Sequence, residues 1–236
     1  GQYVQIASPT DRVYQNSLLE LKYHARILNK MGLPKDSVMV VHGGGVFCNK
    51  ENTLKVLEKR IMELPDKIKK RLVLENDEKC YDVDDLLPVC QNTDVPFVFD
   101  YFHHECYKKL HPEKKYKDIE TLIPQIVQTW FKRGMRPKVH LSEQGLGKTG
   151  AHSVFIEKIP EILIHMAPVD IMLEAKGKEI AVSRIYHKYP KLKPQGAKDL
   201  PNVIPKRAMK DIRIEEKYVD IDCHCEQFGG DMYFKQ

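Results

Sequence analysis

Long hydrophobic runs are absent from these 236 residues, and so is the basic and then apolar pattern of a secretory signal peptide. We therefore expect no membrane span and an intracellular protein. The six cysteines are scattered through a chain without secretory features, which favours reduced thiols over a disulfide framework. Cys223-His224-Cys225 has no second pair at zinc-finger spacing, so we interpret it as part of a surface or terminal segment.

Two nucleotide-binding fingerprints are also missing. Gly43-Gly44-Gly45 follows an apolar run but lacks the spacing of a dinucleotide-binding turn, and we interpret it as a tight turn. The segment from Gly145 to Thr149 ends like a phosphate-binding loop, but position 142 is serine where that motif needs its first glycine. We interpret the segment as a mobile loop. The net charge of +5 is mild, so it permits a nucleic-acid partner without requiring one.

Short apolar runs of strand type alternate with segments of helical periodicity, and the length is that of one α/β domain or most of one. Such alternation predicts a parallel sheet with right-handed crossovers. Strands are expected at 38–42, 71–75, 97–100, 138–141 and 169–173. Helices are expected from Asn16 or Ser17 to about Gly32, and over 51–64, 83–90, 119–131, 153–165 and 178–186.

Each predicted strand delivers a side chain that binds metal ions at or near its carboxyl end. These residues are His42, Glu75, Asp100, His140 and Glu174. A parallel α/β barrel builds a metal site in this way. His103 follows Asp100 as an Asp-x-x-His pair where the strand is expected to run out into a loop; the adjacent His104 is an alternate ligand or a supporting partner, and His152 completes the set. Mixed histidine and carboxylate ligands suit Mn²⁺ or Zn²⁺ better than Ca²⁺.

The segments that carry these residues are similar to the UV damage endonucleases, the UvdE-type DNA repair family. The sequences of two further segments, DLLPVCQ and TWFKRG, most resemble those of the fungal members. The matching segments run in the family's order over about the first 190 residues: 1–3 (GQY), 18–24 (LLELKYH), 42–45 (HGGG), 71–77 (RLVLEND), 100–104 (DYFHH), 137–143 (PKVHLSE), 151–153 (AHS) and 173–176 (LEAK).

The resemblance implies a TIM barrel of the xylose-isomerase-like type, of which this chain holds about five of eight β/α units. The family's barrel begins before Gly1, so the resemblance places residues 1–190 in the C-terminal part of the barrel. It also implies that a histidine ligand preceding Gly1 is missing, and that the fragment by itself is poorly folded or inactive. Residues 191–236 are expected to form a divergent or disordered tail.

The resemblance also implies a function. The expected activity is nicking of DNA immediately 5′ of cyclobutane pyrimidine dimers and 6-4 photoproducts, with two or three divalent ions, Mn²⁺ first and Zn²⁺ or Mg²⁺ as alternatives. Gln2 and Tyr3 match a pair that probes the lesion, and Lys138 matches a lysine that is carboxylated in some members. The residues expected to act in catalysis are Glu75 and Glu174, as bridging ligands, and Lys138, which would support a metal ion if carboxylated. The implied metal ligands are His42, Glu75, Asp100, His103, His140, His152 and Glu174.

The implied partner is damaged double-stranded DNA, bound by a monomer in the nucleus, with mitochondria as a second location. Three alternatives stay open. An endonuclease IV-like nuclease for abasic sites would use a similar barrel and metal rim, but that family expects Asp-x-His where residues 138–140 read Lys-Val-His. A sugar isomerase of the same barrel class would need no Gln-Tyr pair facing DNA. An inactive DNA-binding fragment is the third.

Overall fold

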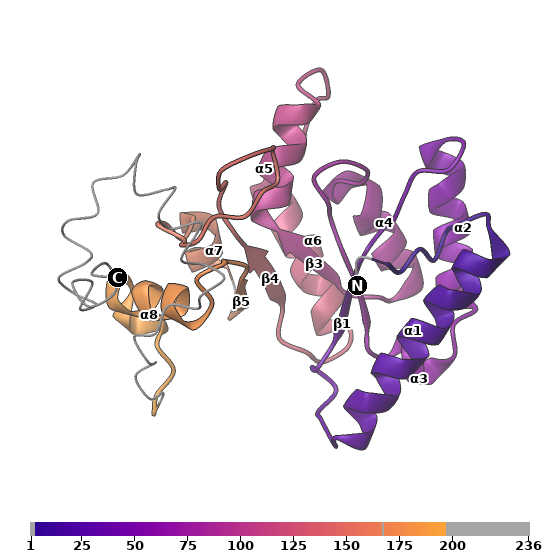
Figure 1. Ribbon diagram of the computed structural model, residues 1–236, viewed down its shortest axis with the longest axis horizontal. Helices are drawn as coiled ribbons and strands as arrows, with labels where there is room; N and C mark the ends of the chain where they lie inside the picture. The colour runs from indigo at the N-terminus through magenta and orange to yellow at the C-terminus, as the bar shows by residue number, and fades with distance from the viewer. Residues whose placement is uncertain (1–2, 167, 197–236) are drawn as a thin grey trace, which may run out of the picture. The chain divides into compact units, whose positions relative to one another are not determined.

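The computed structural model describes residues 3–166 and 168–196, in which helices alternate with short strands (Figure 1). The strands are β1 (Met39–His42), β2 (Leu72–Glu75), β3 (Phe97–Asp100), β4 (Lys138–Leu141) and β5 (Asp170–Leu173). The helices are α1 (Asp11–Lys30), α2 (Lys50–Met62), α3 (Asp66–Lys69), α4 (Val83–Thr93), α5 (Tyr101–Leu110), α6 (Ile119–Phe131), α7 (Glu161–His165) and α8 (Glu179–Lys188), followed by the 3₁₀ turn η1 (Pro190–Leu192).

The chain divides into two compact units. The first holds the residues up to Leu141 together with Pro160–Met172, and the second holds Ser142–Ile159 and the residues from Leu173 onward. The predicted boundary near residue 190 stays a prediction. Cys223, His224 and Cys225 lie outside the described residues, as does most of the predicted tail.

The strands lie in one sheet in the order β1-β2-β3-β4-β5. The pairs β1–β2, β2–β3 and β3–β4 are parallel, as the alternation of strands and helices predicts. The register pairs His42 with Glu75 and Asp100 with His140. Between β2 and β3 the register pairs Glu75 with Val98, two residues before Asp100. Carboxyl ends of adjacent strands therefore meet with their functional side chains at one edge of the sheet.

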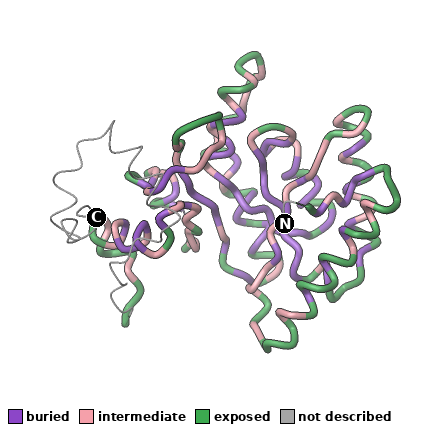
Figure 2. The backbone as a smooth tube through the Cα atoms, in the orientation of Figure 1, coloured by how far each residue is buried: buried purple, intermediate pink, exposed green. Residues whose placement is uncertain are grey.

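Strands β2 and β3 are buried at every position, which is typical of parallel strands covered on both faces (Figure 2). Val73 and Val98 from these strands pack with Trp130 of α6 and with Met135. The indole Nε1 of Trp130 donates a 2.7 Å hydrogen bond to the carbonyl oxygen of Phe97. This cluster fixes α6 against the middle of the sheet.

Three sequence-based expectations about the helices were wrong. Helix α1 begins at Asp11, five residues before Asn16. An acidic residue in the first turn suits the positive end of the helix dipole. Ser17 is not a cap: inside the helix its hydroxyl donates to the carbonyl of Val13 and accepts from the amide of Gln5, each at 2.8 Å.

The other two corrections concern α5 and α7. Strand β3 runs directly into α5 instead of a loop, because the side chain of Asp100 caps this helix by accepting from the amide of His103 at 2.8 Å. Of the helix expected over 153–165, only Glu161–His165 forms. Pro160 has no N–H and disfavours helical geometry in the residue before it, so a helix begins after it and does not run through it.

No helix in the described part of the chain is long and apolar enough to cross a bilayer.

We predict that Trp130→Ala lowers the free energy of unfolding by about 3–5 kcal/mol, because it leaves a cavity in a closely packed core and orphans the carbonyl of Phe97. The neighbouring Phe131 is 51% exposed, so Phe131→Ala should cost less than about 1 kcal/mol. Urea unfolding followed by far-UV circular dichroism measures both, since Trp130 is the only tryptophan and its fluorescence is lost. Equal losses in the two variants would contradict this description of the core.

Candidate metal centre

Five side chains converge at the carboxyl ends of β1 to β4. His42, Glu75 and His103 form one group, and Glu75, Asp100 and His140 form another; within each group the nitrogen and oxygen ligand atoms lie within 4.8 Å of one another. Glu75 belongs to both groups. The strand register and the start of α5 thus bring together five of the seven predicted ligands.

The carboxylate of Glu75 lies at the centre of this cluster. Its Oε1 is 2.8 Å from Nδ1 of His140 and 3.8 Å from Nδ1 of His103, and its Oε2 is 3.1 Å from Nε2 of His42. Burial raises the pKa of Glu75, but the hydrogen bonds and charges of His140 and His42 outweigh burial and hold that pKa well below its ordinary value. Glu75 is therefore an ionised carboxylate inside the protein.

The pKa of Asp100 is shifted in the opposite direction from that of Glu75. Burial is the largest cause that raises its pKa to about 6; His103 lowers the pKa and the neighbouring Glu75 raises it further. Its Oδ1 caps α5. Its Oδ2 is buried, lies 3.7 Å from Nδ1 of His103 and accepts no hydrogen bond from the described residues. An unsatisfied buried carboxylate oxygen is costly, and a bound cation would remove that cost.

The residues present fit a divalent metal ion. Two buried carboxylates and three imidazoles converge, one carboxylate oxygen lacks a donor, and mixed nitrogen and oxygen ligands are those of Mn²⁺, Zn²⁺ or Fe²⁺ sites. No thiolate stands among the ligands of the two groups. The geometry supports the sequence-based expectation of a metal site, but the identity of the ion stays a prediction.

Asn76 is a supporting residue that the sequence analysis did not single out. Its side-chain Nδ2 donates to the carbonyl of Asp100 at 2.9 Å, and its Oδ1 accepts from the amide of Asp100 at 2.9 Å. Its own carbonyl lies 3.1 Å from Nδ1 of His103. Asn76 thereby joins the end of β2 to the end of β3. The only signal in the sequence is a polar residue directly after the last residue of an apolar strand.

His104, the other supporting candidate, is buried between aromatic rings. Its ring centroid lies 5.6 Å from that of Phe99 and 6.3 Å from that of Tyr116. Burial lowers its pKa. These ring contacts support a packing role, and His104 belongs to neither ligand group.

The remaining two predicted ligands belong to the second unit. There Nδ1 of His152 lies 3.7 Å from Oε2 of Glu174, and both side chains are about one third exposed. A backbone bridge between Gln144 and His152 closes the loop that holds Gly145 to Thr149. This pair has the donor types that a metal ligand pair needs.

Lys138, expected to be carboxylated, begins β4 and lies largely buried. Its ammonium is 2.7 Å from Oδ2 of Asp170, whose Oδ1 is 3.2 Å from Arg136. Burial raises the pKa of Asp170, and the two cations outweigh burial and lower it overall. The structure thus shows Lys138 as half of an ion pair, and its carboxylation stays a prediction.

The predicted lesion-probing pair is described only in part. Gln2 lies outside the described residues. Tyr3 is 87% exposed, the largest exposure among the bulky apolar and aromatic side chains that the structure describes.

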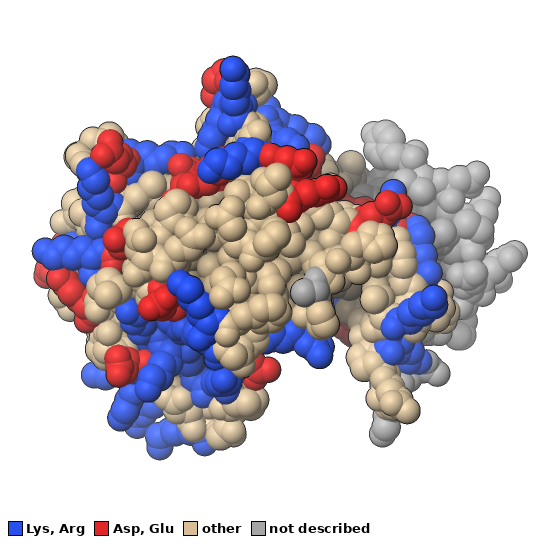
Figure 3. All heavy atoms as spheres, turned by 180° about the vertical axis from the view of Figure 1, so that it is seen from behind, with Lys and Arg blue, Asp and Glu red and all other residues tan. Residues whose placement is uncertain are grey.

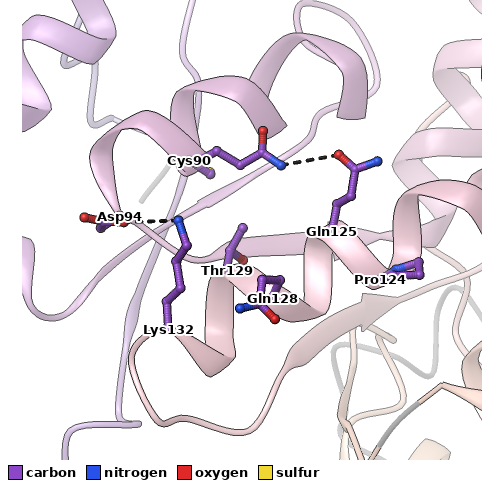
Figure 4. Close-up of a pocket in the computed structure, with 8 residues that line it drawn as sticks. Cys90, Asp94, Pro124, Gln125, Gln128, Thr129 and Lys132 are labelled. Atoms are coloured by element: carbon purple, nitrogen blue, oxygen red, sulfur yellow. Dashed lines mark hydrogen bonds and ion pairs between the residues drawn. The ribbon is translucent and has the colours of Figure 1, made fainter.

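A cavity of about 380 Å³ lies elsewhere, between α4 and α6 (Figure 4). Its polar side chains pair with one another: Gln91 with Gln125 at 3.3 Å, and Lys132 with Asp94 at 3.6 Å. No residue of the metal cluster lines it. We assign no role to it.

Comparison with known proteins identifies related chains. The family model for UV-endonuclease UvdE matches residues 1–201. A protein of Acanthamoeba polyphaga mimivirus is 41% identical over 197 residues, covering 80% of this chain and 58% of that protein. The UV-damage endonuclease of Schizosaccharomyces pombe is 40% identical over 200 residues, covering 80% of this chain and 33% of the relative.

Among solved structures, the crystal structure of SacUVDE has 33% sequence identity and a TM-score of 0.69, and the match covers 81% of this chain and 65% of that chain. The predicted α/β fold of the TIM-barrel class is thereby confirmed. The chain spans about 58% and 33% of the length of the two relatives above. Because the family model covers most of the chain, this protein belongs to the UV-endonuclease UvdE family.

Proposed function

We propose that this chain carries the metal centre of a DNA repair endonuclease that cuts the phosphodiester bond immediately 5′ of UV photoproducts. One observation carries the proposal: the buried, ionised carboxylate of Glu75 is shared by two groups of ligand side chains at the strand ends. Membership of the UvdE family supports the reaction class. The position of the cut and the need for metal are parts of the proposal.

The chain's own residues hold and orient the reacting groups. Glu75 contacts His42 through one carboxylate oxygen and His140 through the other. Asp100 ends β3 and His103 lies in the first turn of α5. Asn76 holds the backbone of Asp100 with its side chain and contacts the ring of His103 with its carbonyl. Buried ligands held by several elements keep their geometry when a substrate binds.

Two or three divalent ions, Mn²⁺ first, would activate water as the nucleophile and stabilise the negative charge on the phosphate and on the leaving 3′ oxygen. We further assign ligand roles to His152 and Glu174, because they have the matching donor types and lie side by side. Lys138 would support the metal centre if it becomes carboxylated, a change that would first have to break its ion pair with Asp170.

The proposed substrate is damaged double-stranded DNA, with Gln2 and Tyr3 probing the lesion. An exposed aromatic ring can insert where bases unstack easily, and photoproducts weaken stacking. On the face shown in Figure 3, lysine and arginine side chains alternate with acidic ones around a broad area with neither. The mild net charge of +5 permits recognition by contact with a distorted duplex and supplies no strong general attraction to DNA. The monomeric state and the nuclear location are also proposals.

The direct test is Mn²⁺-dependent nicking of a duplex with one defined cyclobutane dimer. The chain should be assayed alone and in a longer, extended protein that adds the segments by which its relatives exceed it in length. We expect a cut 5′ of the dimer by the extended protein, leaving a 3′-hydroxyl and a 5′-phosphate. Cleavage of an abasic site with the dimer uncut would favour an endonuclease IV-like nuclease. Cleavage of neither would refute the proposed reaction.

Glu75→Gln should weaken Mn²⁺ binding by more than about 100-fold. Changes to residues that merely support a ligand cost about 10- to 100-fold in metal affinity, and this change removes the shared charge itself. Titration calorimetry with Mn²⁺ measures the affinity without reference to nicking. Glu63→Gln, at the exposed end of α2, is the matched control and should bind Mn²⁺ as the parent does. Unchanged affinity in Glu75→Gln would exclude Glu75 as a ligand.

Asn76→Ala should reduce Mn²⁺ affinity by about 10- to 100-fold through the loss of support for Asp100. The free energy of unfolding should fall by about 1–3 kcal/mol, because two buried backbone groups lose their partners. Asn92→Ala is the control, since that side chain makes a 3.0 Å contact with Glu58 on the surface. If Asn76→Ala matched Asn92→Ala in both Mn²⁺ affinity and the free energy of unfolding, the supporting role of Asn76 would be wrong.

A further inference from the structure

The residues from Tyr3 to Ser8 form a segment, here called the N-terminal strap, that lies before α1 and has no regular secondary structure. Three tethers hold it. The amide of Gln5 donates to Ser17 Oγ of α1 at 2.8 Å. Arg60 of α2 donates to the carbonyls of Ile6 and Ser8, each at 2.7 Å. The third tether is the side chain of Gln5, whose Oε1 accepts from the amide of Gly45 at 2.8 Å.

The third tether differs from the other two because it ends in the loop that follows β1. The carbonyl of Gly45 is also bonded, because it accepts a hydrogen bond from the hydroxyl of Tyr81 at 3.1 Å. His42 lies three residues before Gly45 and contacts Glu75. A continuous series of contacts therefore runs from the strap to the metal cluster within one compact unit.

The loop is shaped around the carboxamide of Gln5. Gly44 has a φ of +91°, which favours glycine, and a Cβ atom there would lie 2.8 Å from Gln5 Oε1. The positive φ accounts for glycine at position 44, the middle residue of the run that the sequence predicts to be a tight turn. The amide of Gly45 then holds the carboxamide of Gln5 beside this glycine.

The strap presents one exposed aromatic side chain beside this anchor. Val4 and Ile6 are buried, whereas Tyr3 is 87% exposed. The burial of Val4 and Ile6 and the two bonds from Arg60 also hold the strap on the protein. The carboxamide of Gln5 adds a fixed relation between the strap and the loop of His42.

We propose that Gln5 is a positioning residue: its hydrogen bond to Gly45 fixes the Tyr3-bearing strap relative to the metal cluster and so sets the preference for damaged over undamaged DNA. This inference rests on the proposed function. An aromatic probe discriminates only if it meets the duplex at a fixed place relative to the group that cuts, and a misplacement of about 1 Å is enough to weaken such a reaction strongly. Gln5 acts through Tyr3 and the loop and does not touch the reacting atoms.

The test compares Gln5→Leu, which has no acceptor, with Gln5→Glu, which keeps an acceptor oxygen for the amide of Gly45. Gln15→Leu is the control, because Gln15 is exposed on α1 and bonds only to Asp11 among the described contacts. Each variant is made in the chain and in the N-terminally extended protein. The readout is the ratio of dissociation constants for undamaged duplex and for the same duplex with one cyclobutane dimer, with Mn²⁺ binding and thermal unfolding measured in parallel.

We expect Gln5→Leu to lower this ratio by about fivefold, the effect of losing one hydrogen bond, with Mn²⁺ affinity unchanged. Gln5→Glu should bind both duplexes more weakly, because it adds negative charge, yet keep the ratio. A ratio that stays high in Gln5→Leu, or one that falls equally in Gln5→Glu, would overturn the role of Gln5. A parent protein with no preference for the dimer would instead refute the proposed function, and the inference with it.

Discussion

The site depends on keeping one carboxylate, that of Glu75, ionised where little water reaches it. An isolated buried carboxylate would take up a proton, because burial favours the neutral form. Here imidazoles contact both oxygens of Glu75 and reverse that tendency. The arrangement is possible because the parallel register sets His42 beside Glu75 and Asp100 beside His140.

The fold supplies this register with few residues. Each strand has four residues, and β2 and β3 are completely buried, so that their apolar side chains fix the strands while the last residue of each faces the cluster. Asn76 then fixes the end of β2 to the end of β3, and the cap of α5 fixes the end of β3 to that helix. The carboxylate of Asp100 is less well stabilised than that of Glu75. Its Oδ2 is buried and lacks a hydrogen-bond partner among the described residues. Burial is the largest cause that raises the pKa of Asp100 to about 6. A divalent cation would balance that charge.

Much of this could be predicted from the sequence, since an apolar strand that ends in His, Asp or Glu is a local signal. The bounds of α6 and β4 were predicted to the residue, and the strand ends at His42, Glu75 and Asp100 were correct. Long-range contacts were not predicted. No local pattern reveals that Asn76 bonds the backbone of Asp100, that Lys138 faces Asp170, or that Gln5 reaches Gly45 over 40 positions. The start of α5 was missed for a related reason, because Asp100 serves at once as a strand end, a helix cap and a candidate ligand.

The central claim is that this cluster binds divalent metal through Glu75, and anomalous X-ray diffraction from crystals grown with Mn²⁺ tests it most directly. The account predicts a manganese peak about 2.0–2.2 Å from a carboxylate oxygen of Glu75, with imidazole nitrogens of His42 or His140 completing the coordination. The absence of such a peak at saturating Mn²⁺, or a peak only at sites without Glu75, would contradict it.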